Sequence, residues 1–207
     1  MLSMQRGLSI VGGVALTFTT GWVGLIVIPH LQLGELIAQT EEGTGDAYPR
    51  RLEGLAAQGR SVYVSEGCIY CHTQQVRAEG YGTDILRGWG DRRTVPRDYV
   101  FDYPILLGSM RTGPDLANIG ARQPDETWHF LHLYNPVITS PGSIMPPFDY
   151  LFEKRRIVGE RAYNALLLKD EWAPPEGFEI VPSDRATALV AYLKAQNRTF
   201  PLKEANR

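Results

Sequence analysis

Two cysteines and a histidine form the most specific chemical pattern in this chain. The pattern is C-x-x-C-H, typical of c-type haem attachment, and it reads Cys68-Ile69-Tyr70-Cys71-His72. Two thiols separated by two residues can reach the two vinyl positions at one edge of a porphyrin, and the next residue can then ligate the iron. We therefore expect Cys68 and Cys71 to hold one haem c covalently, with His72 as its proximal ligand.

Two other uses of this cysteine pair are considered. A thioredoxin-like redox pair needs a strand before it and a long helix after it, whereas Gly67 precedes this motif and Thr73-Gln74-Gln75 follows it. A zinc site needs further ligands at metal spacing, and the chain has no third cysteine. Haem attachment is the favoured interpretation.

A low-spin electron-transfer haem needs a second axial ligand, for which Met145 is favoured. Prolines on both sides stiffen the loop that would hold its thioether against the iron, in the segment Pro141-Gly142-Ser143-Ile144-Met145-Pro146-Pro147. A lone methionine is more often a core residue that fills a gap. The other candidates are Met110, His30, His129 and His132, of which the last two lie on a helix predicted over residues 124–134, where a packing or surface role is expected.

A second segment is predicted to orient the proximal histidine. A ligating histidine normally donates its other ring proton to a carbonyl group, and a proline can hold such a carbonyl rigidly. In c-type cytochromes a Gly-Pro-x-Leu loop has this role and packs on the proximal haem face. Gly113, Pro114 and Leu116 are therefore candidate haem contacts, with an ordinary turn as the alternative.

The N-terminal segment is long and apolar enough to cross a membrane. It has no charged residue between Gly7 and Ile28. A hydrocarbon core of ~30 Å needs ~20 apolar residues in a helix, more than the ~7 to 15 of a signal peptide. We expect a transmembrane anchor over residues 1–31; a cleaved signal peptide and a buried soluble helix are the alternatives.

Charges beside this span predict its orientation. Arg6 precedes the span, and the residues that follow are neutral or acidic, including Glu35 and Asp46. By the positive-inside rule the N-terminus is cytoplasmic. We therefore predict a single-pass protein of the bacterial cytoplasmic (inner) membrane, in contact with membrane lipid, with its haem domain in the periplasm.

Beyond the span we expect a tether over residues 32–51 and a cytochrome c domain over residues 52–207. Apolar residues at helical spacing predict a helix from Leu55 to Glu66, and Pro182-Ser183-Asp184 is a start signal for another. The many glycines and prolines between them predict loops and short helices. The expected fold class is mostly α, with a single N-terminal transmembrane helix followed by a loop-rich α-helical cytochrome c domain.

Composition excludes several classes of function. The 207 residues carry 21 Lys and Arg against 23 Asp and Glu, so no basic excess suggests a nucleic-acid partner. The chain has four histidines, one of them expected at the haem, and no histidine cluster for copper. We therefore expect no oxygen-reducing site in this chain.

These motifs resemble those of the mono-haem subunit II, or O subunit, of cbb3-type cytochrome c oxidases. The likeness runs from Glu66 to about Phe152, less than half of the chain, and the N-terminal anchor and C-terminal helix also fit that family. It rests on Glu66-Gly67-Cys68-x-x-Cys71-His72-x-Gln74-x-x-Arg77, Asp102-Tyr103-Pro104, Leu107-Gly108-Ser109, Arg111-Thr112-Gly113-Pro114-Asp115-Leu116, Trp128-His129, His132-Leu133-Tyr134-Asn135-Pro136 and Ser143-x-Met145-Pro146.

The resemblance implies an electron relay. Electrons would arrive from a di-haem cytochrome c subunit or a soluble cytochrome c, and leave for the low-spin haem b of a haem-copper catalytic subunit; the family's axial methionine falls at Met145. Residues 88–99 depart from the family pattern, and Met110 occupies a position where a lysine is familiar. The alternatives are a cytochrome c subunit of a nitric oxide reductase-like complex and a free-standing membrane-anchored electron shuttle.

The segment from Asp102 to Arg111 is too apolar, and too lacking in helical spacing, for a simple solvated loop. We expect it to face the catalytic subunit. Arg111 would pair with a carboxylate or a haem propionate across that interface, or else pair within its own domain.

Overall fold

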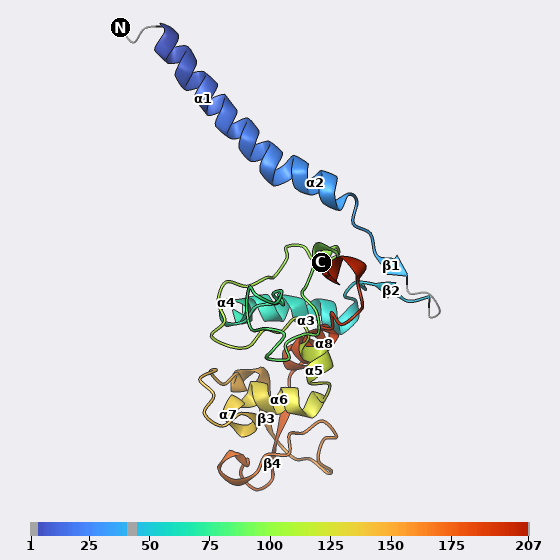
Figure 1. The fold of residues 1–207 in the computed structure, drawn as a ribbon. Coiled ribbons are helices and arrows are strands. Elements are labelled where there is room, and N and C mark those ends of the chain that lie inside the picture. The colour runs from blue at the N-terminus through green and yellow to red at the C-terminus, as the bar shows by residue number, and fades with distance from the viewer. Residues whose placement is uncertain (1–3, 41–44, 207) are drawn as a thin grey trace. The chain divides into compact units, whose positions relative to one another are not determined.

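The structure is a computed structural model that describes residues 4–40 and 45–206. The chain divides into two compact units, one up to Ala38 and the other from Gln39 onward. Most of the regular structure is helical (Figure 1), as the sequence predicts.

The first unit is one continuous helix. It comprises α1 (Met4–Trp22), a π-helical turn η1 (Val23–Val27) and α2 (Ile28–Leu33). Its 28 residues from Arg6 to Leu33 are long and apolar enough to cross a membrane, because at 1.5 Å per residue they span about 42 Å. The expected N-terminal helix, long and apolar enough to span a membrane, is therefore present.

The π-helical turn has a local cause in Pro29. Proline has no backbone N–H, and its ring would clash with the carbonyl group four residues earlier in a regular α-helix. In η1 the N–H of Ile28 donates instead to the carbonyl oxygen of Val23, five residues back. The helix thus continues past the proline and ends at Gly34, whose φ of 61° is not helical.

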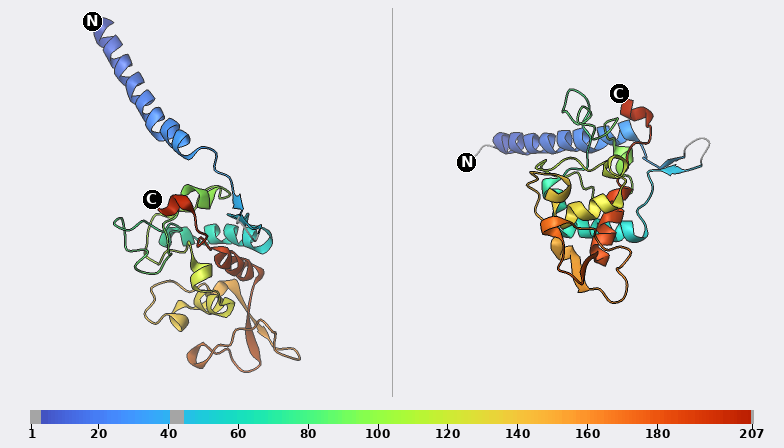
Figure 2. Two further views of the ribbon diagram at one scale, coloured as in Figure 1. Left: turned by 45° about the vertical axis from the view of Figure 1, so that its right-hand side comes forward. Right: turned by 90° about the horizontal axis from the view of Figure 1, so that it is seen from below.

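The second unit is built on two helices, α3 (Gly54–Ser65) and α8 (Asp184–Ala195), which lie side by side (Figures 1 and 2). Their contact requires Gly59, since a Cβ atom there would lie 1.8 Å from the carbonyl oxygen of Ala188. The predicted start of α8 is confirmed: the Ser183 side chain caps it by accepting from the Ala186 N–H at 3.3 Å.

The chain between α3 and α8 consists of loops and short elements. The longest helix in this part is α6 (Glu126–Tyr134), which Asp125 caps by accepting from the Thr127 N–H. The elements of this part and of the C-terminal tail are α4 (Cys68–Cys71), η2 (Pro96–Tyr99), α5 (Ile119–Arg122), α6 (Glu126–Tyr134), α7 (Pro136–Thr139), η3 (Asp149–Leu151), η4 (Asp170–Trp172) and η5 (Lys203–Asn206).

The described part of this unit also contains two small antiparallel sheets. β1 (Gln39–Thr40) pairs with β2 (Ala47–Tyr48), and β3 (Phe152–Arg156) pairs with β4 (Phe178–Pro182) in the register Phe152 to Pro182. β4 leads directly into α8, and the Ser183 N–H donates to the Leu151 carbonyl oxygen at 3.0 Å. The β3–β4 hairpin therefore fixes where α8 begins.

The end of the segment expected to be a tether contacts the domain. The Tyr48 hydroxyl donates to Asp98 Oδ1 at 2.5 Å, and the Tyr48 ring stacks on Phe200 with 4.7 Å between centroids. Burial is the main cause that raises the pKa of Tyr48, and the neighbouring Asp98 carboxylate adds to it. Tyr48 thus joins the N-terminal side of the domain to its C-terminal tail.

Candidate haem site

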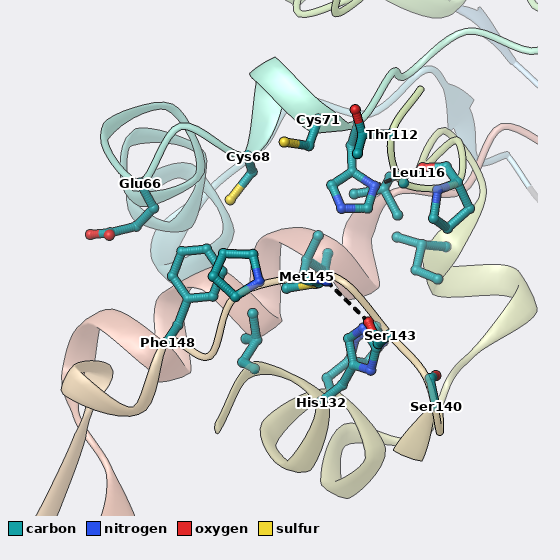
Figure 3. A pocket seen from close by; sticks show the side chains of 18 of the residues that line it. Glu66, Cys68, Cys71, Thr112, Leu116, His132, Ser140, Ser143, Met145 and Phe148 are labelled. Atoms are coloured by element: carbon teal, nitrogen blue, oxygen red, sulfur yellow. Dashed lines mark hydrogen bonds between the residues drawn. The ribbon is translucent and has the colours of Figure 1, made fainter. Parts of the chain in front are cut away.

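The cysteine pair lies on a single helical turn. α3 ends at Ser65 with Glu66 as its C-cap, and Gly67, with a φ of 74°, reverses the chain in the left-handed conformation that glycine favours. In α4 the His72 N–H donates to the Cys68 carbonyl oxygen at 3.0 Å. Residues three apart share one face of a helix, and Figure 3 shows the sulfur atoms of Cys68 and Cys71 on the same pocket. The two thiols form no disulfide.

The imidazole of His72 is fixed by its contacts with Gly113 and Pro114. His72 Nδ1 lies 2.7 Å from the Pro114 carbonyl oxygen, the contact that the Gly-Pro-x-Leu pattern predicts. A Cβ atom at Gly113 would lie 2.3 Å from His72 Cε1, so only glycine leaves room for the ring. Burial lowers the pKa of His72, against the effect of the Pro114 carbonyl. This favours the neutral imidazole, which is the form that ligates a metal.

Hydrogen bonds hold the segment around Pro114 against the motif. The Gly113 N–H donates to the Cys71 carbonyl oxygen at 2.9 Å, and the Leu116 N–H donates to that of Thr73 at 2.8 Å. Buried Asp115 accepts from the Thr73 hydroxyl at 2.5 Å. Backbone hydrogen bonds before and after Pro114 therefore fix the position of this residue.

The Met145 loop forms the other side of the pocket. The Met145 N–H donates to Ser143 Oγ at 3.2 Å, and the Phe148 N–H donates to the Leu133 carbonyl oxygen of α6 at 2.9 Å. Figure 3 shows Met145 across the pocket from Cys68 and Cys71. The first bond lies within the loop, and the second holds the loop against α6.

All the residues that the sequence singles out for the haem line one cavity of about 690 Å³. They come from three separate segments of the chain and are Cys68, Cys71, His72, Gly113, Pro114, Leu116 and Met145.

The other candidate axial ligands are placed differently. Met110 is 59% exposed and does not line the cavity, while His30 lies on α2 in the N-terminal helix. His129 and His132 also line the cavity, and one ring nitrogen of each has a hydrogen-bond partner: His129 Nε2 lies 2.8 Å from the Gln123 carbonyl oxygen, and His132 Nδ1 lies 2.6 Å from Thr139 Oγ1. Burial lowers the pKa of His132 to about 4.

Several lining residues were not foreseen from the sequence. Leu189 and Leu193 of α8 are a pair at i and i+4 that shares a helix face, and Trp128 of α6 lies four residues before the candidate ligand His132. That spacing could have identified them. No such signal identifies the other unforeseen lining residues, which include Tyr63, Arg122 and Phe148.

Arg111 pairs within its own domain, which is one of the two outcomes that the sequence leaves open. Its side chain is only 16% exposed and forms an ion pair with Asp84. It also donates to Thr73 Oγ1 at 2.9 Å and to the Gln75 carbonyl oxygen at 2.6 Å. In the same loop, Tyr103 is 94% exposed.

The cavity fits a haem in size, in its donor atoms and in its unsatisfied polar groups. Cofactor sites have volumes of roughly 300 to 1,000 Å³, a range that includes this one. Two lining residues of the described chain carry buried polar atoms without a hydrogen-bond partner, Tyr63 Oη and Arg122 Nε. Burial raises the pKa of the Cys68 thiol to about 12, whereas reactive C-x-x-C thiols have a lowered pKa.

Comparison with known proteins agrees with this site. The family model described as cytochrome c oxidase, mono-haem subunit/FixO, matches residues 14–171, well over half of the chain. A comparison with curated proteins finds no match. The family description implies one haem, and it implies a catalytic subunit as partner in an oxidase complex. The chain therefore belongs to the FixO family of mono-haem cytochrome c oxidase subunits.

Proposed function

We propose that this chain relays electrons from a cytochrome c donor to the low-spin haem b of a haem-copper catalytic subunit, in a cbb3-type oxidase. One observation carries the proposal: in a member of the FixO family, the C-x-x-C-H motif and Met145 line the same cavity. A haem bound there would supply one-electron redox chemistry. Oxygen reduction would belong to the partner.

The chain's own residues would attach, ligate and enclose the haem. Cys68 and Cys71 would form the thioether bonds, and His72 and Met145 would be the axial ligands. The Pro114 carbonyl oxygen orients the His72 ring. Apolar side chains of the cavity wall would exclude water from the iron, among them Leu116, Phe148 and Leu189.

Covalent attachment can be tested on denaturing gels stained for haem. The wild-type chain of 23.1 kDa should carry the stain, and the double variant Cys68→Ala, Cys71→Ala should lose it. Tyr70→Ala is the matched control, because Tyr70 lies within the motif and is 71% exposed. A haem band that survives in the double variant would refute thioether attachment.

We further propose that the anchor lies in the bacterial inner membrane, with the N-terminus cytoplasmic and the haem domain periplasmic. Arg6 before the span and the acidic residues after it, such as Glu35, support this orientation. In intact spheroplasts an added protease should cleave the domain. A domain that is protected until the membrane is lysed would reverse the orientation.

The exposed loop over residues 103–110 is proposed to face the catalytic subunit. Tyr103, Ile105 and Met110 are 94%, 49% and 59% exposed. The same loop packs on the haem motif, since a Cβ atom at Gly108 would lie 2.3 Å from the His72 carbonyl oxygen. Docking here would bring the partner close to the axial histidine.

Paired substitutions test this docking surface. Tyr103→Ser with Ile105→Ser should weaken co-purification with the catalytic subunit and leave the haem spectrum normal. Tyr163→Ser is the control, because Tyr163 is fully exposed, as Tyr103 nearly is, but lies far from this loop in the sequence. Equal recovery of the partner with both variants would show that this loop is not the docking surface.

Purification from native membranes in mild detergent identifies the partners. We expect a haem-copper subunit to co-elute, together with a di-haem cytochrome c subunit unless a soluble cytochrome c is the donor, and we expect the complex to consume oxygen. Consumption of nitric oxide instead would indicate a nitric oxide reductase-like complex. A chain that elutes alone would indicate a free-standing electron shuttle.

A further inference from the structure

A second, open cleft lies outside the haem cavity and has a volume of about 500 Å³. Its wall includes Arg77 and Arg93, together with Gln75, Val76, Tyr81 and Thr94. Among the described residues, no aspartate or glutamate lines it. Two arginines and no carboxylate on the wall of one cleft are the composition expected of an anion-binding site.

Hydrogen bonds of Thr94 bring the two arginines to this cleft. The Thr94 N–H donates to the Val76 carbonyl oxygen at 3.0 Å, and the Thr94 hydroxyl donates to the same oxygen at 3.3 Å. Arg77 follows Val76 in the sequence, and Arg93 precedes Thr94. Arg93 Nη2 also donates to the Glu204 carbonyl oxygen at 2.7 Å, which ties this side chain to the C-terminal tail. The fold therefore holds two positive charges beside one cleft.

The side chain of Arg77 is available to an anion from outside the domain. It is exposed, and the ion pairs of the described chain do not include it. Its charge helps to lower the pKa of Asp84, but Asp84 Oδ1 pairs with Arg111 and its Oδ2 accepts from the Arg77 backbone N–H at 2.7 Å. Water solvates an exposed guanidinium, and a protein surface that covers the cleft would remove this water. A partner that binds here must therefore supply an anion.

The cleft adjoins the loop over residues 103–110, which is proposed to face the catalytic subunit. The Gln74 N–H donates to the Leu107 carbonyl oxygen of that loop at 3.0 Å. Arg111, directly after the loop, donates to the carbonyl oxygen of the cleft residue Gln75 at 2.6 Å. A partner that docks on the loop would thus lie next to the cleft.

We propose that this cleft receives a carboxylate side chain of the catalytic subunit, with Arg77 and Arg93 as its cations. The inference rests on the proposed function, under which that subunit docks on the loop over residues 103–110. A guanidinium group matches a carboxylate because adjacent N–H groups donate in parallel to its two oxygens. Tyr81, which lines the cleft and is 84% exposed, would contact the same partner. The charged contact would fix the orientation in which the catalytic subunit docks.

The first test uses the complex purified from native membranes in mild detergent and immobilised through this chain. Arg77→Gln removes the charge but keeps the backbone N–H that donates to Asp84, and Arg77→Lys keeps the charge but loses the fork. Arg156→Gln is the matched control: Arg156 is also exposed and outside the ion pairs of the described chain, but it does not line the cleft. The measurement is the sodium chloride concentration that releases half of the catalytic subunit.

We expect Arg77→Gln to lower this concentration roughly twofold or more, Arg77→Lys to recover part of the loss, and Arg156→Gln to match the wild-type chain. Each variant should retain its haem, because neither arginine lines the haem cavity. Equal release for Arg77→Gln and Arg156→Gln would overturn the inference and leave the proposed function standing. Absence of the catalytic subunit from the wild-type preparation would instead overturn the proposed function.

Carbodiimide treatment of the Arg77→Lys complex identifies the anion. The reagent activates a carboxylate, and an amine held against that carboxylate then forms an amide bond while the reagent leaves as a urea. Mass spectrometry should find the peptide that carries position 77 joined to an aspartate or glutamate of the catalytic subunit. No cross-link at this position, or a cross-link only to a lipid, to another subunit or within this chain, would overturn the inference.

Discussion

The Nδ1 atom of His72 lies 2.7 Å from the carbonyl oxygen of Pro114, and this contact determines which ring nitrogen is available to a metal. In the tautomer that carries its proton on Nδ1, that nitrogen donates to Pro114 and leaves the lone pair of Nε2 free. Gly113 lies under the same ring, where a Cβ atom would be 2.8 Å from Nε2. One short segment therefore sets both the tautomer and the position of the imidazole.

Gly113→Ala should displace the His72 ring. The added Cβ atom would overlap Cε1 at 2.3 Å, and overpacking of this kind costs about 1 to 3 kcal/mol. We expect a lower melting temperature of the haem-loaded chain and an absorption spectrum that indicates weakened axial ligation. Pro114→Ala keeps the carbonyl oxygen and should have a smaller effect. Normal spectra for Gly113→Ala would show that the ring can move without loss of ligation.

Met145→Leu should open the sixth coordination position and lower the reduction potential, because a thioether favours reduced iron. A fall on the order of 0.1 V is expected, a small part of the ~0.8 V that axial ligands span. Redox titration followed by absorption spectroscopy measures it. Met110→Leu is the control, because Met110 is exposed and does not line the cavity. A potential that changes with Met110 and not with Met145 would reassign the ligand.

Arg111→Gln should destabilise the domain. The Arg111 side chain is 16% exposed and its partner Asp84 only 2%, and removal of one member of a buried ion pair costs about 3 to 5 kcal/mol. Urea denaturation monitored by haem absorption gives the free energy of unfolding. Arg87→Gln is matched, since both guanidinium groups lie over the Trp89 ring, at 5.2 Å for Arg87 and 5.3 Å for Arg111, but Arg87 is exposed. Equal stabilities would indicate that the Arg111 network contributes little.

Acid should weaken the domain through Asp84. Burial raises the pKa of this carboxyl, but the hydrogen bonds from Arg111 and from the Arg77 N–H lower it more, so the net pKa is below its usual value. A group whose pKa is lower in the folded state stabilises the fold above its unfolded pKa of ~3.9, and this stabilisation is lost as the pH falls through the folded pKa.

Melting temperatures measured from pH 7 down to pH 3 test this dependence. We expect a steep loss below about pH 5 in the wild-type chain. Asp84→Asn should be less stable at pH 7 but should lose less on acidification. If both proteins lose the same amount between pH 5 and pH 3, the acid sensitivity belongs to other carboxylates.

The parts of the fold that the sequence predicts depend on local signals. The start of α8 follows from the capping residue Ser183, and α3 follows from apolar residues at helical spacing between Leu55 and Glu66. The spanning helix follows from its length and apolar composition. Each of these signals lies within a few turns of the element that it specifies.

The parts that the sequence does not predict depend on contacts between distant segments. Arg111 pairs with Asp84 only because the loop that carries each residue folds back on the motif. The strand β3 is exposed after Phe152, so its residues show no alternation to mark it. No sequence pattern identifies Arg122 as a cavity residue. Its place on the cavity wall follows from the packing of α5 near α8, where a Cβ atom at Gly120 would lie 2.0 Å from the Lys194 carbonyl oxygen.

The packing of α3 against α8 sets an order of events in biosynthesis. The cysteines are synthesised well before α8, whose Leu189 and Leu193 complete the cavity wall. Until α8 has been synthesised, α3 lacks the helix that packs closely against it at Gly59. The cysteine motif would therefore not yet be enclosed by the domain. Accessible thiols would thus precede the closed cavity, and α8, which is synthesised after them, would complete its wall.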